Sequence, residues 1–231
     1  MRDHSPEGHV VLRYDGELSQ LHLMVLEMGG LVLSQLKDSI NALKGLDAKR
    51  AQQIVETDRK VDLLEFEVDE KVLSLAALRS PVARDLRLVL MVSKCVTELE
   101  EAGDEVVNIA RKIIQLHGDD GVQPPPKLLQ GLISIGEYAV GMLSDAVKAY
   151  DLLEENPAAR VIYEHPALEI RFQAELRRIV VFEVHDSRIV GQVVDIALIA
   201  KSLEAIGQHA KKIAEQVIFY IHGTDIRHEA H

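Results

Sequence analysis

The sequence has one cysteine, no tryptophan and no long uncharged segment. Cys95 cannot form a disulfide within the chain, which agrees with a reducing compartment, and we expect it to be a small buried apolar residue. The longest stretch without Asp, Glu, Lys or Arg has nine residues, whereas a membrane-spanning helix needs about 20 mostly apolar residues. The sequence therefore excludes a disulfide scaffold and a transmembrane helix.

Positive charge is also scarce. The chain has 26 Lys and Arg residues against 37 Asp and Glu residues, which gives a formal net charge of -11. A protein that binds phosphodiester backbones needs a basic surface, so nucleic acid is not an expected partner. Apolar residues make up 47% of the chain, which is too many for a disordered protein.

The N-terminal segment, from Met1 to Asp15, lacks the apolar stretch of a secretory signal. It contains Asp3, His4 and Glu7, which a signal peptide would not carry at these positions. We therefore expect a cytoplasmic protein.

Signals for β-strands are few, because aromatic residues are only 4% of the chain and apolar and polar residues never alternate for long. Capping residues, helix-breaking glycines and apolar residues at helical spacing are frequent instead. Six helices are expected, over residues 15–44, 47–79, 80–116, 127–153, a segment that starts at Asn156 and Pro157, and 186–222. The Ser80-Pro81 pair is expected to cap the start of the third helix. Three consecutive prolines, Pro124 to Pro126, mark a linker.

The two halves of the chain repeat one pattern. One offset aligns Asp38 with Asp145, and a second offset, shorter by three positions, aligns Gly103 with Gly207. The fold predicted from this duplication is all-α, with two homologous antiparallel three-helix bundles related by a pseudo-twofold axis. The expected organisation is a tail (1–14), a first bundle (15–118), a linker (119–126), a second bundle (127–223) and a tail (224–231).

Two pairs of acidic residues in the first half are candidate metal ligands. Asp58 with Asp62, and Glu100 with Asp104, are each spaced four residues apart, which places both carboxylates on one face of a helix. Asp62 precedes Ser80 by nearly as many residues as Glu100 follows it. Asp58 and Asp104 lie one helical turn farther from Ser80, and their separations from it also nearly match. An antiparallel hairpin would bring all four to one level. Such a cluster suits Mg²⁺, Mn²⁺, Ca²⁺, iron or Zn²⁺ bound through oxygen.

The second half keeps this geometry but changes the residues. His165 and Glu169 precede Asp186, and Glu204 and Gln208 follow it, again at nearly matching separations. This candidate second metal site is less negative, so we expect a softer or less charged occupant, or none. Gly103 and Gly207 stand at equivalent positions, which suggests close helix approach or room for a ligand.

Several of these segments resemble the PhoU family, bacterial proteins that regulate phosphate uptake and phosphate-starvation signalling. Residues 99–104 (LEEAGD) and 108–110 (NIA) resemble the repeated LERIGD and NIA elements of the family, and residues 203–208 (LEAIGQ) resemble a second copy. Residues 80–87 (SPVARDLR) are similar to its helix-turn segment, and residues 223–228 (GTDIRH) to its C-terminus. The resemblance extends from residue 26 to residue 228.

The resemblance implies two symmetric three-helix bundles, each with a metal cluster on paired E(D)xxxD motifs. The first-half carboxylates match this pattern in full, whereas His165 and Gln208 depart from it in the second half. The implied function is negative regulation by a cytoplasmic adaptor, expected to be a homodimer. This adaptor would contact the ATP-binding subunit of the phosphate transporter and the sensor histidine kinase, and it needs no catalytic activity.

Two other functions are compatible with the residues alone. One is a carboxylate-bridged metal oxidase of the helical-bundle type, although such enzymes typically use Glu-x-x-His pairs. The other is a purely structural helical protein whose acidic residues are solvated. Metal analysis would separate the structural protein from the other two, and oxygen consumption would separate the oxidase from the adaptor.

Overall fold

The computed structural model describes residues 6–118, 124–182 and 189–223, and the side chains of residues 6–15 and 118 are not described. The regular elements of these ranges are all helices, as predicted: α1 (Pro6–Gly45), α2 (Ala48–Thr57), α3 (Arg59–Arg79), α4 (Ala83–Gly118), α5 (Pro126–Leu152), α6 (Glu155–Val180) and α7 (Ile189–His222). Within them, no helix combines the length and the hydrophobicity that crossing a bilayer requires.

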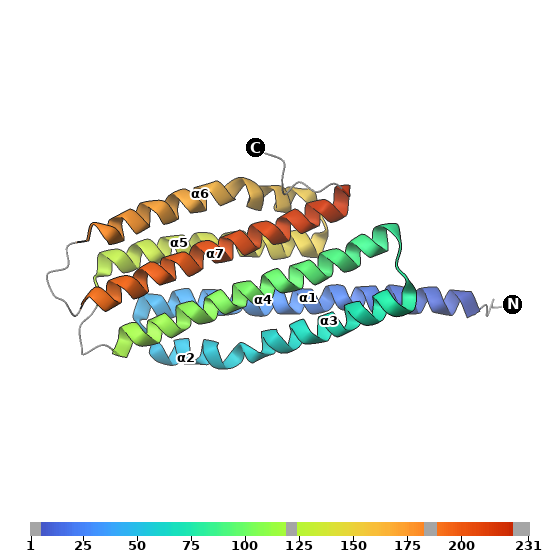
Figure 1. Ribbon diagram of the computed structural model, residues 1–231, viewed down its shortest axis with the longest axis horizontal. Coiled ribbons are helices and arrows are strands. Elements are labelled where there is room, and N and C mark those ends of the chain that lie inside the picture. The colour runs from blue at the N-terminus through green and yellow to red at the C-terminus, as the bar shows by residue number, and fades with distance from the viewer. Residues whose placement is uncertain (1–5, 119–123, 183–188, 224–231) are drawn as a thin grey trace.

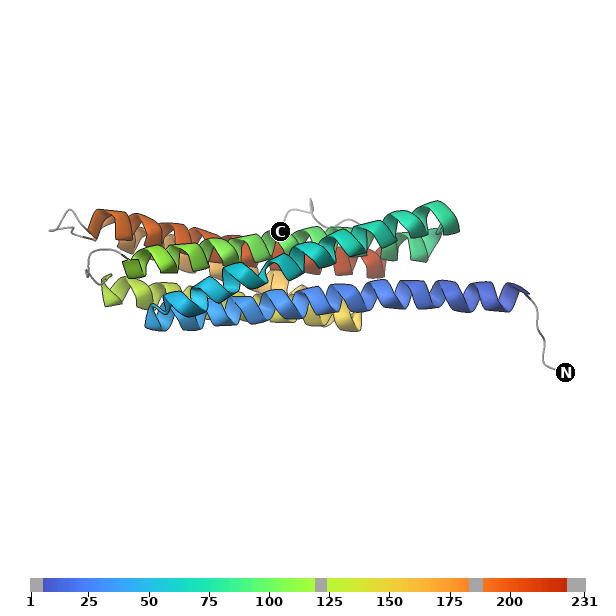
Figure 2. The ribbon, with the colours of Figure 1, turned by 90° about the horizontal axis from the view of Figure 1, so that it is seen from below.

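The helices form two elongated bundles that lie side by side (Figure 1). The first bundle contains α1, α4 and the α2–α3 pair, and the second contains α5, α6 and α7. Helix α4 packs against α7 and α1 packs against α5, so equivalent helices of the two repeats meet at the interface. Figure 2 shows that the N-terminal end of α1 extends beyond the rest of the molecule. The predicted pair of three-helix bundles is confirmed.

The second predicted helix, over residues 47–79, is divided in two at Asp58. The Thr57 hydroxyl donates to the Gln53 carbonyl at 2.9 Å and lies 3.1 Å from the Ile54 carbonyl. A hydroxyl in this position competes with the backbone for helix acceptors and bends a helix. Asp58 itself keeps helical angles (φ -59°, ψ -35°), and the chain continues from it directly into α3.

The turn between α3 and α4 differs from the prediction. Ser80 is the residue that ends α3, with φ 45°, and α4 begins at Ala83, so the prediction that Ser80 caps the start of the next helix was wrong. A proline disfavours the right-handed helical region for the residue before it, and Ser80 adopts the left-handed region instead. The antiparallel hairpin is nevertheless present.

Helix α1 begins at Pro6, nine residues before the expected start at Asp15, so the predicted tail over residues 1–14 is too long. In the sequence Pro6 follows Ser5, and a proline is well tolerated in the first turn of a helix. Residues 1–5, most of the linker, the expected start of the last helix at Asp186 and the tail 224–231 lie outside the described residues.

The core is continuous across both bundles. Cys95 is fully buried, which confirms its predicted place in the core. At the contact of α1 with α5, Ile40 lies directly over Gly136, where any Cβ would overlap its side chain. This glycine allows the two bundles to approach closely.

Candidate metal centre

The hairpin of α3 and α4 brings the four first-half carboxylates together. Asp58 lies at the break between α2 and α3, Asp62 lies in the first turn of α3, and Glu100 and Asp104 lie one turn apart on α4. The charge of Asp62 acts on Asp58, Glu100 and Asp104, and the charge of Asp104 acts on Asp58 and Glu100. The four carboxylates therefore lie near one another at the same height along the hairpin, as the residue separations from Ser80 predicted.

Three of these carboxylates, Asp58, Glu100 and Asp104, bind protons more tightly than ordinary carboxylates do. Asp58 and Glu100 are partly buried, while Asp62 and Asp104 are exposed. Burial, followed by repulsion from Asp62 and Asp104, raises the pKa of Asp58 to about 6. Burial, followed by repulsion from Asp104 and other carboxylates, raises the pKa of Glu100 to about 7. The pKa of Asp104 is also raised, by burial and by Asp62, although Arg111 opposes this shift.

A fifth carboxylate, which sequence reasoning missed, belongs to the cluster. The pKa of Glu65 on α3 is raised by burial and by Asp69, Asp62 and Asp104, and its charge acts on Glu100 in turn. Glu65 follows Asp62 by three residues, which also places two side chains on one face of a helix. Carboxylates spaced by three residues share a helical face just as those spaced by four do, so this spacing could have identified Glu65. We call Asp58, Asp62, Glu65, Glu100 and Asp104 the carboxylate cluster.

Gly103 of α4 lies directly beneath this cluster. A Cβ at this position would lie 3.6 Å from Asp58 Oδ1 and 3.5 Å from Val61 Cγ1. These are ordinary van der Waals distances, and they show that α4 packs closely against the start of α3. A Cβ would therefore fit at Gly103, and the close approach of α4 to α3 does not require a glycine there.

The carboxylate cluster fits a hard cation by the chemistry of its donors. All five members offer oxygen ligands, and their mutual repulsion would be relieved by a bound positive charge. In the side-chain positions of the described residues, no three His, Cys, Asp or Glu side chains are already arranged to hold a metal ion. A metal ion held by three of these side chains would require side-chain rotation, which is available to Asp62 and Asp104 because both are exposed.

The second-half residues form a different kind of site. His165 is buried, and burial and the nearby Lys211 lower its pKa, while the charges of Glu169 and Glu204 oppose this shift. The Lys201 ammonium lies 2.5 Å from Glu204 Oε2. Glu169 is exposed at the edge of an open groove between α6 and α7 that Lys201 and Glu204 also line.

Two lysines supply positive charge at positions where the first half has uncharged residues, although Arg111 is a cation near the first cluster. In the alignment that pairs Gly103 with Gly207, Lys201 falls on Thr97 and Lys211 falls on Val107. Lys201 already pairs with Glu204, one of the two acidic residues that remain. Since this half carries its own cations and fewer carboxylates, its residues do not fit a metal cluster like that of the first half.

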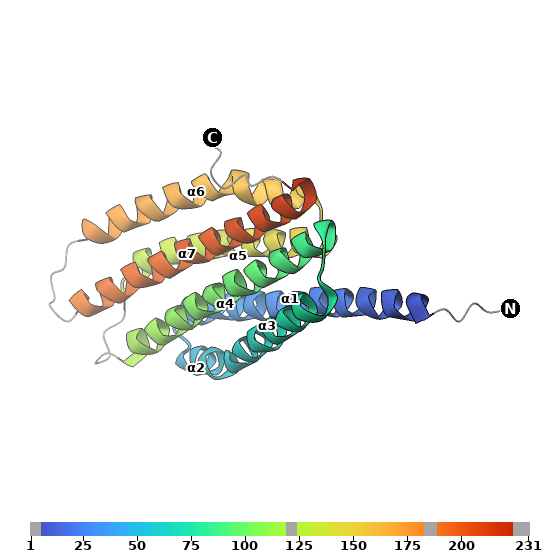
Figure 3. The same cartoon turned by 45° about the vertical axis from the view of Figure 1, so that its right-hand side comes forward.

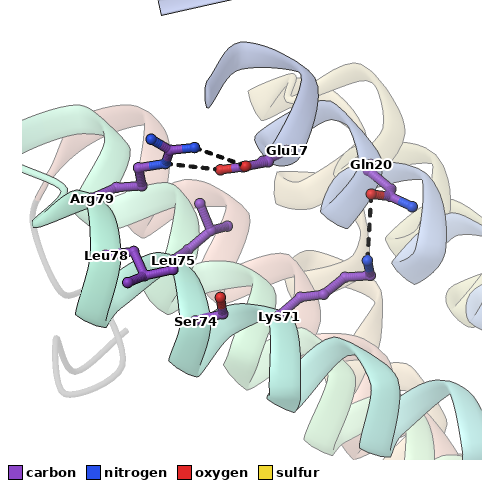
Figure 4. Close-up of a pocket in the computed structure, with 7 residues that line it drawn as sticks. All are labelled: Glu17, Gln20, Lys71, Ser74, Leu75, Leu78 and Arg79. Atoms are coloured by element: carbon purple, nitrogen blue, oxygen red, sulfur yellow. Dashed lines mark hydrogen bonds and ion pairs between the residues drawn. The ribbon is translucent and has the colours of Figure 1, made fainter. Parts of the chain in front are cut away.

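A separate hollow lies between α1 and the C-terminal part of α3 (Figure 4). Arg79 donates two hydrogen bonds to the Glu17 carboxylate, at 3.1 and 2.9 Å, and Lys71 Nζ lies 3.4 Å from Gln20 Oε1. These contacts fasten α1 to α3. No pattern in the sequence pointed to them, because the partners are far apart along the chain.

The raised pKa values predict how stability depends on pH. In the metal-free protein the folded state holds protons on Asp58 and Glu100 more tightly than the unfolded state does, so their protonation stabilises the fold. This contribution is complete below the ordinary carboxylate pKa and is lost as the pH rises through about 6 to 7. Urea unfolding in the presence of a chelator should therefore show a decrease in this part of the stability between pH 5 and pH 7.5.

The variant Asp58→Asn/Glu100→Gln is the control for this prediction. It cannot titrate at these positions, so its free energy of unfolding should depend less steeply on pH over the same window. Parallel pH profiles for the variant and the wild type would contradict the assignment.

Comparison with known protein families identifies two matching segments. The family described as "PhoU domain" matches residues 25–113 and residues 132–217, one segment in each bundle. The chain is 35% identical over 223 residues to a phosphate-specific transport system accessory protein PhoU homolog of Pseudomonas aeruginosa, with 95% of this chain and 90% of the relative covered. It is 31% identical over 220 residues to the accessory protein PhoU of Escherichia coli, with the same coverage of 95% and 90%.

Two solved structures share the fold. The crystal structure of PhoU from Pseudomonas aeruginosa superimposes with a TM-score of 0.87 at 34% identity, covering 91% of this chain and all (100%) of that one. The phosphate transport system regulatory protein PhoU from Streptococcus pneumoniae superimposes with a TM-score of 0.79 at 22% identity, covering 92% and 98%. With two matching domains, and relatives that align over nearly the whole chain, this protein belongs to the PhoU family.

Proposed function

We propose that this chain is an accessory regulator of phosphate uptake and phosphate-starvation signalling. It acts in the cytoplasm as an adaptor between the ATP-binding subunit of the phosphate transporter and the sensor histidine kinase, and it signals that phosphate is sufficient. The names of the relatives, which are accessory proteins of a phosphate-specific transport system, support the link to phosphate transport. These relatives are named as accessory proteins and not as enzymes, and the adaptor role requires no catalysis.

We also propose that the adaptor binds metal in its first half. The observation that supports this is the carboxylate cluster, in which the charges of neighbouring acidic residues, together with burial, raise the pKa of Asp58, Glu65, Glu100 and Asp104. A divalent or trivalent ion such as iron, zinc, manganese or magnesium would neutralise this charge and fix α3 to α4. The cluster contains no histidine, so it lacks the Glu-x-x-His pairs that carboxylate-bridged oxidases typically use.

The adaptor role is tested by capture of the two proposed partners. The immobilised protein should retain the transporter's ATP-binding subunit and the sensor kinase, each added in purified form, and retention should change between high and low phosphate. Light scattering of the same preparation would test the expected homodimer. Failure to retain either protein at both phosphate concentrations would contradict the adaptor role.

Metal binding should not depend on the second half. We expect Glu169→Gln/Glu204→Gln, and separately Gln208→Ala, to leave the metal content of the purified protein unchanged, because Lys201 already neutralises Glu204. Elemental analysis of wild type and variants purified in parallel measures this. A loss of about half of the bound metal in either variant would show that His165, Glu169, Glu204 and Gln208 form a second metal site.

A further inference from the structure

Helix α3 carries apolar residues on two opposite faces. Val61, Val68 and Leu75 point into the first bundle and are buried. Leu63, Phe66 and Leu73 lie on the other side and are 51%, 65% and 67% exposed. Large apolar residues that cluster on one exposed face commonly mark an interaction site, whereas isolated ones carry no such meaning.

The exposed residues are spaced as in a coiled coil. Leu63, Phe66, Glu70, Leu73 and Ala77 follow one another at intervals of three, four, three and four residues, and all five are exposed. At about 100° per residue they fall on a single face, and we call them the outer stripe of α3. Four of the five are apolar. This pattern is the one by which a helix contacts a second helix along its length.

No described element covers the outer stripe. Among the described residues α3 packs against α1, α2 and α4, and its remaining side faces outwards along the edge of the molecule (Figure 3). The stripe begins next to the carboxylate cluster, since Leu63 follows Asp62 directly. A helix lying on the stripe would therefore run past the candidate metal centre.

The charges around the stripe define the partner. Asp62 and Asp69 lie along one side, Glu67 lies along the other, and Glu70 lies within it; all four are exposed. Arg59 and Lys60, at the start of α3, are exposed cations of this face, and the exposed charges along the rest of the stripe are acidic. Charged residues that flank an apolar seam select partners of opposite charge. The complementary surface is an amphipathic helix with Lys or Arg beside its apolar face, and an anionic membrane would be repelled.

A second copy of α3 is a poor occupant, because self-pairing would place these acidic residues against one another. The equivalent face of α6 exposes Tyr163, Ile170 and Val180, with Arg171 and Arg177 nearby. Contact of α3 with α6 of another copy would join different faces, which builds a ring or an open chain of molecules and not a twofold dimer. The helix of a different protein is the occupant that the charges and the geometry favour.

We propose that the outer stripe of α3 is the docking site for a basic amphipathic helix of a partner protein. The inference deepens the proposed adaptor function, and it rests on that function for the identity of the protein that carries the helix. The apolar residues supply the contact area, and the flanking acidic residues select the basic partner and set its register.

Designed peptides test the surface without the natural partner. The probe is a fluorescein-labelled amphipathic helix about three heptads long, with Leu on the apolar face and Lys at the flanking positions, and its counterpart has Glu in place of Lys. Fluorescence anisotropy should show that the Lys peptide binds the full-length protein and the Glu peptide does not. Affinity for the Lys peptide should fall as the salt concentration rises.

Matched variants localise the binding. We expect Phe66→Ser/Leu73→Ser to weaken binding of the Lys peptide at least about tenfold, because both side chains belong to the apolar seam. Ile170→Ser/Val180→Ser removes a similar amount of exposed apolar surface from α6 and should leave binding unchanged. Glu100→Gln/Asp104→Asn should also retain it, so a failure of the metal proposal does not affect this result.

Three results would overturn the proposal. They are equal affinity of the α3 variant and the wild type, equal loss in the α3 and α6 variants, and equal binding of the Glu and Lys peptides. Light scattering adds a fourth, because a change of oligomeric state in Phe66→Ser/Leu73→Ser would show that a second copy covers the stripe. Both substituted α3 side chains are mostly exposed, so the variant should unfold at the same temperature as the wild type.

Discussion

Replacing Asp62 and Glu100 together by alanine is expected to abolish metal binding. The two residues lie on α3 and α4 and interact within the carboxylate cluster, so each helix loses one of its ligands. Changes in the surroundings of a metal site already cost 10- to 100-fold in affinity, so the loss of two ligands should exceed about 100-fold. Elemental analysis of the purified protein and titration with Mn²⁺ measure the effect.

The fold should survive this double substitution. Asp62 is exposed and Glu100 is partly buried, and each contributes repulsion in the metal-free state. Their removal should leave the unfolding transition of the metal-free protein unchanged or slightly raise it. The matched control is Glu67→Ala/Glu70→Ala, which removes two exposed acidic residues from α3 outside the cluster and should keep full metal content. Equal metal content in Asp62→Ala/Glu100→Ala and the wild type would rule out the centre.

In a strain that lacks the natural regulator, the same variant tests the link between metal and signalling. The wild-type chain should restore repression of phosphate-starvation genes at high phosphate, and the metal-free variant should not. Normal repression by a variant shown to lack metal would separate the metal from the regulatory function.

Gly207→Ala is expected to destabilise the protein by about 1–3 kcal/mol. Gly207 lies on α7 at a buried contact with α6, and a Cβ there would overlap Leu168 Cδ2 and approach Met142 Sδ at 3.6 Å. Leu168 is fully buried, so its side chain has little space into which it could move. The overlap outweighs the gain of about 1 kcal/mol that alanine normally brings to a helix interior. Urea unfolding gives the difference in stability.

Gly103→Ala is the internal control, because Gly103 is the equivalent residue of the first half. A Cβ at this position meets Val61, Asp58 and Val32 at 3.5 to 3.7 Å, which are ordinary contact distances. The substitution should be neutral or stabilise the fold by up to about 1 kcal/mol. Equal destabilisation by the two substitutions would contradict the difference in packing between the repeats.

The spacing of residues along the chain predicted where along the hairpin the candidate site lies, but it did not predict every residue of the site. The separations of Asp62 and Glu100 from the hairpin placed them correctly, because an antiparallel pair of helices fixes the level of every residue relative to the turn. Glu65 was missed because it follows Asp62 by three residues and only pairs spaced by four were considered. Lys201 also escaped notice, because its contact with Glu204 depends on where both side chains lie in the folded chain.

Local backbone details were predicted less well. The boundary at Ser80 was misread, since a Ser-Pro pair favours a helix start in most contexts but here follows a residue that is already helical. The division of the second helix at Asp58 follows from hydrogen bonds of the Thr57 hydroxyl, a choice that a threonine makes in some helices and not in others.

The sequence by itself determined the helical class, the duplication, the pairing of the acidic residues and the family, since each depends on residue types at regular intervals along the chain. The tertiary structure alone decided that Gly103 has space around it while Gly207 has none, and that the acidic residues of the second half lie beside lysines. It also decided that one apolar face of α3 is buried while the opposite face is left exposed. These properties depend on which side chains from distant segments meet, and the periodicity of a single helix carries no information about its neighbours.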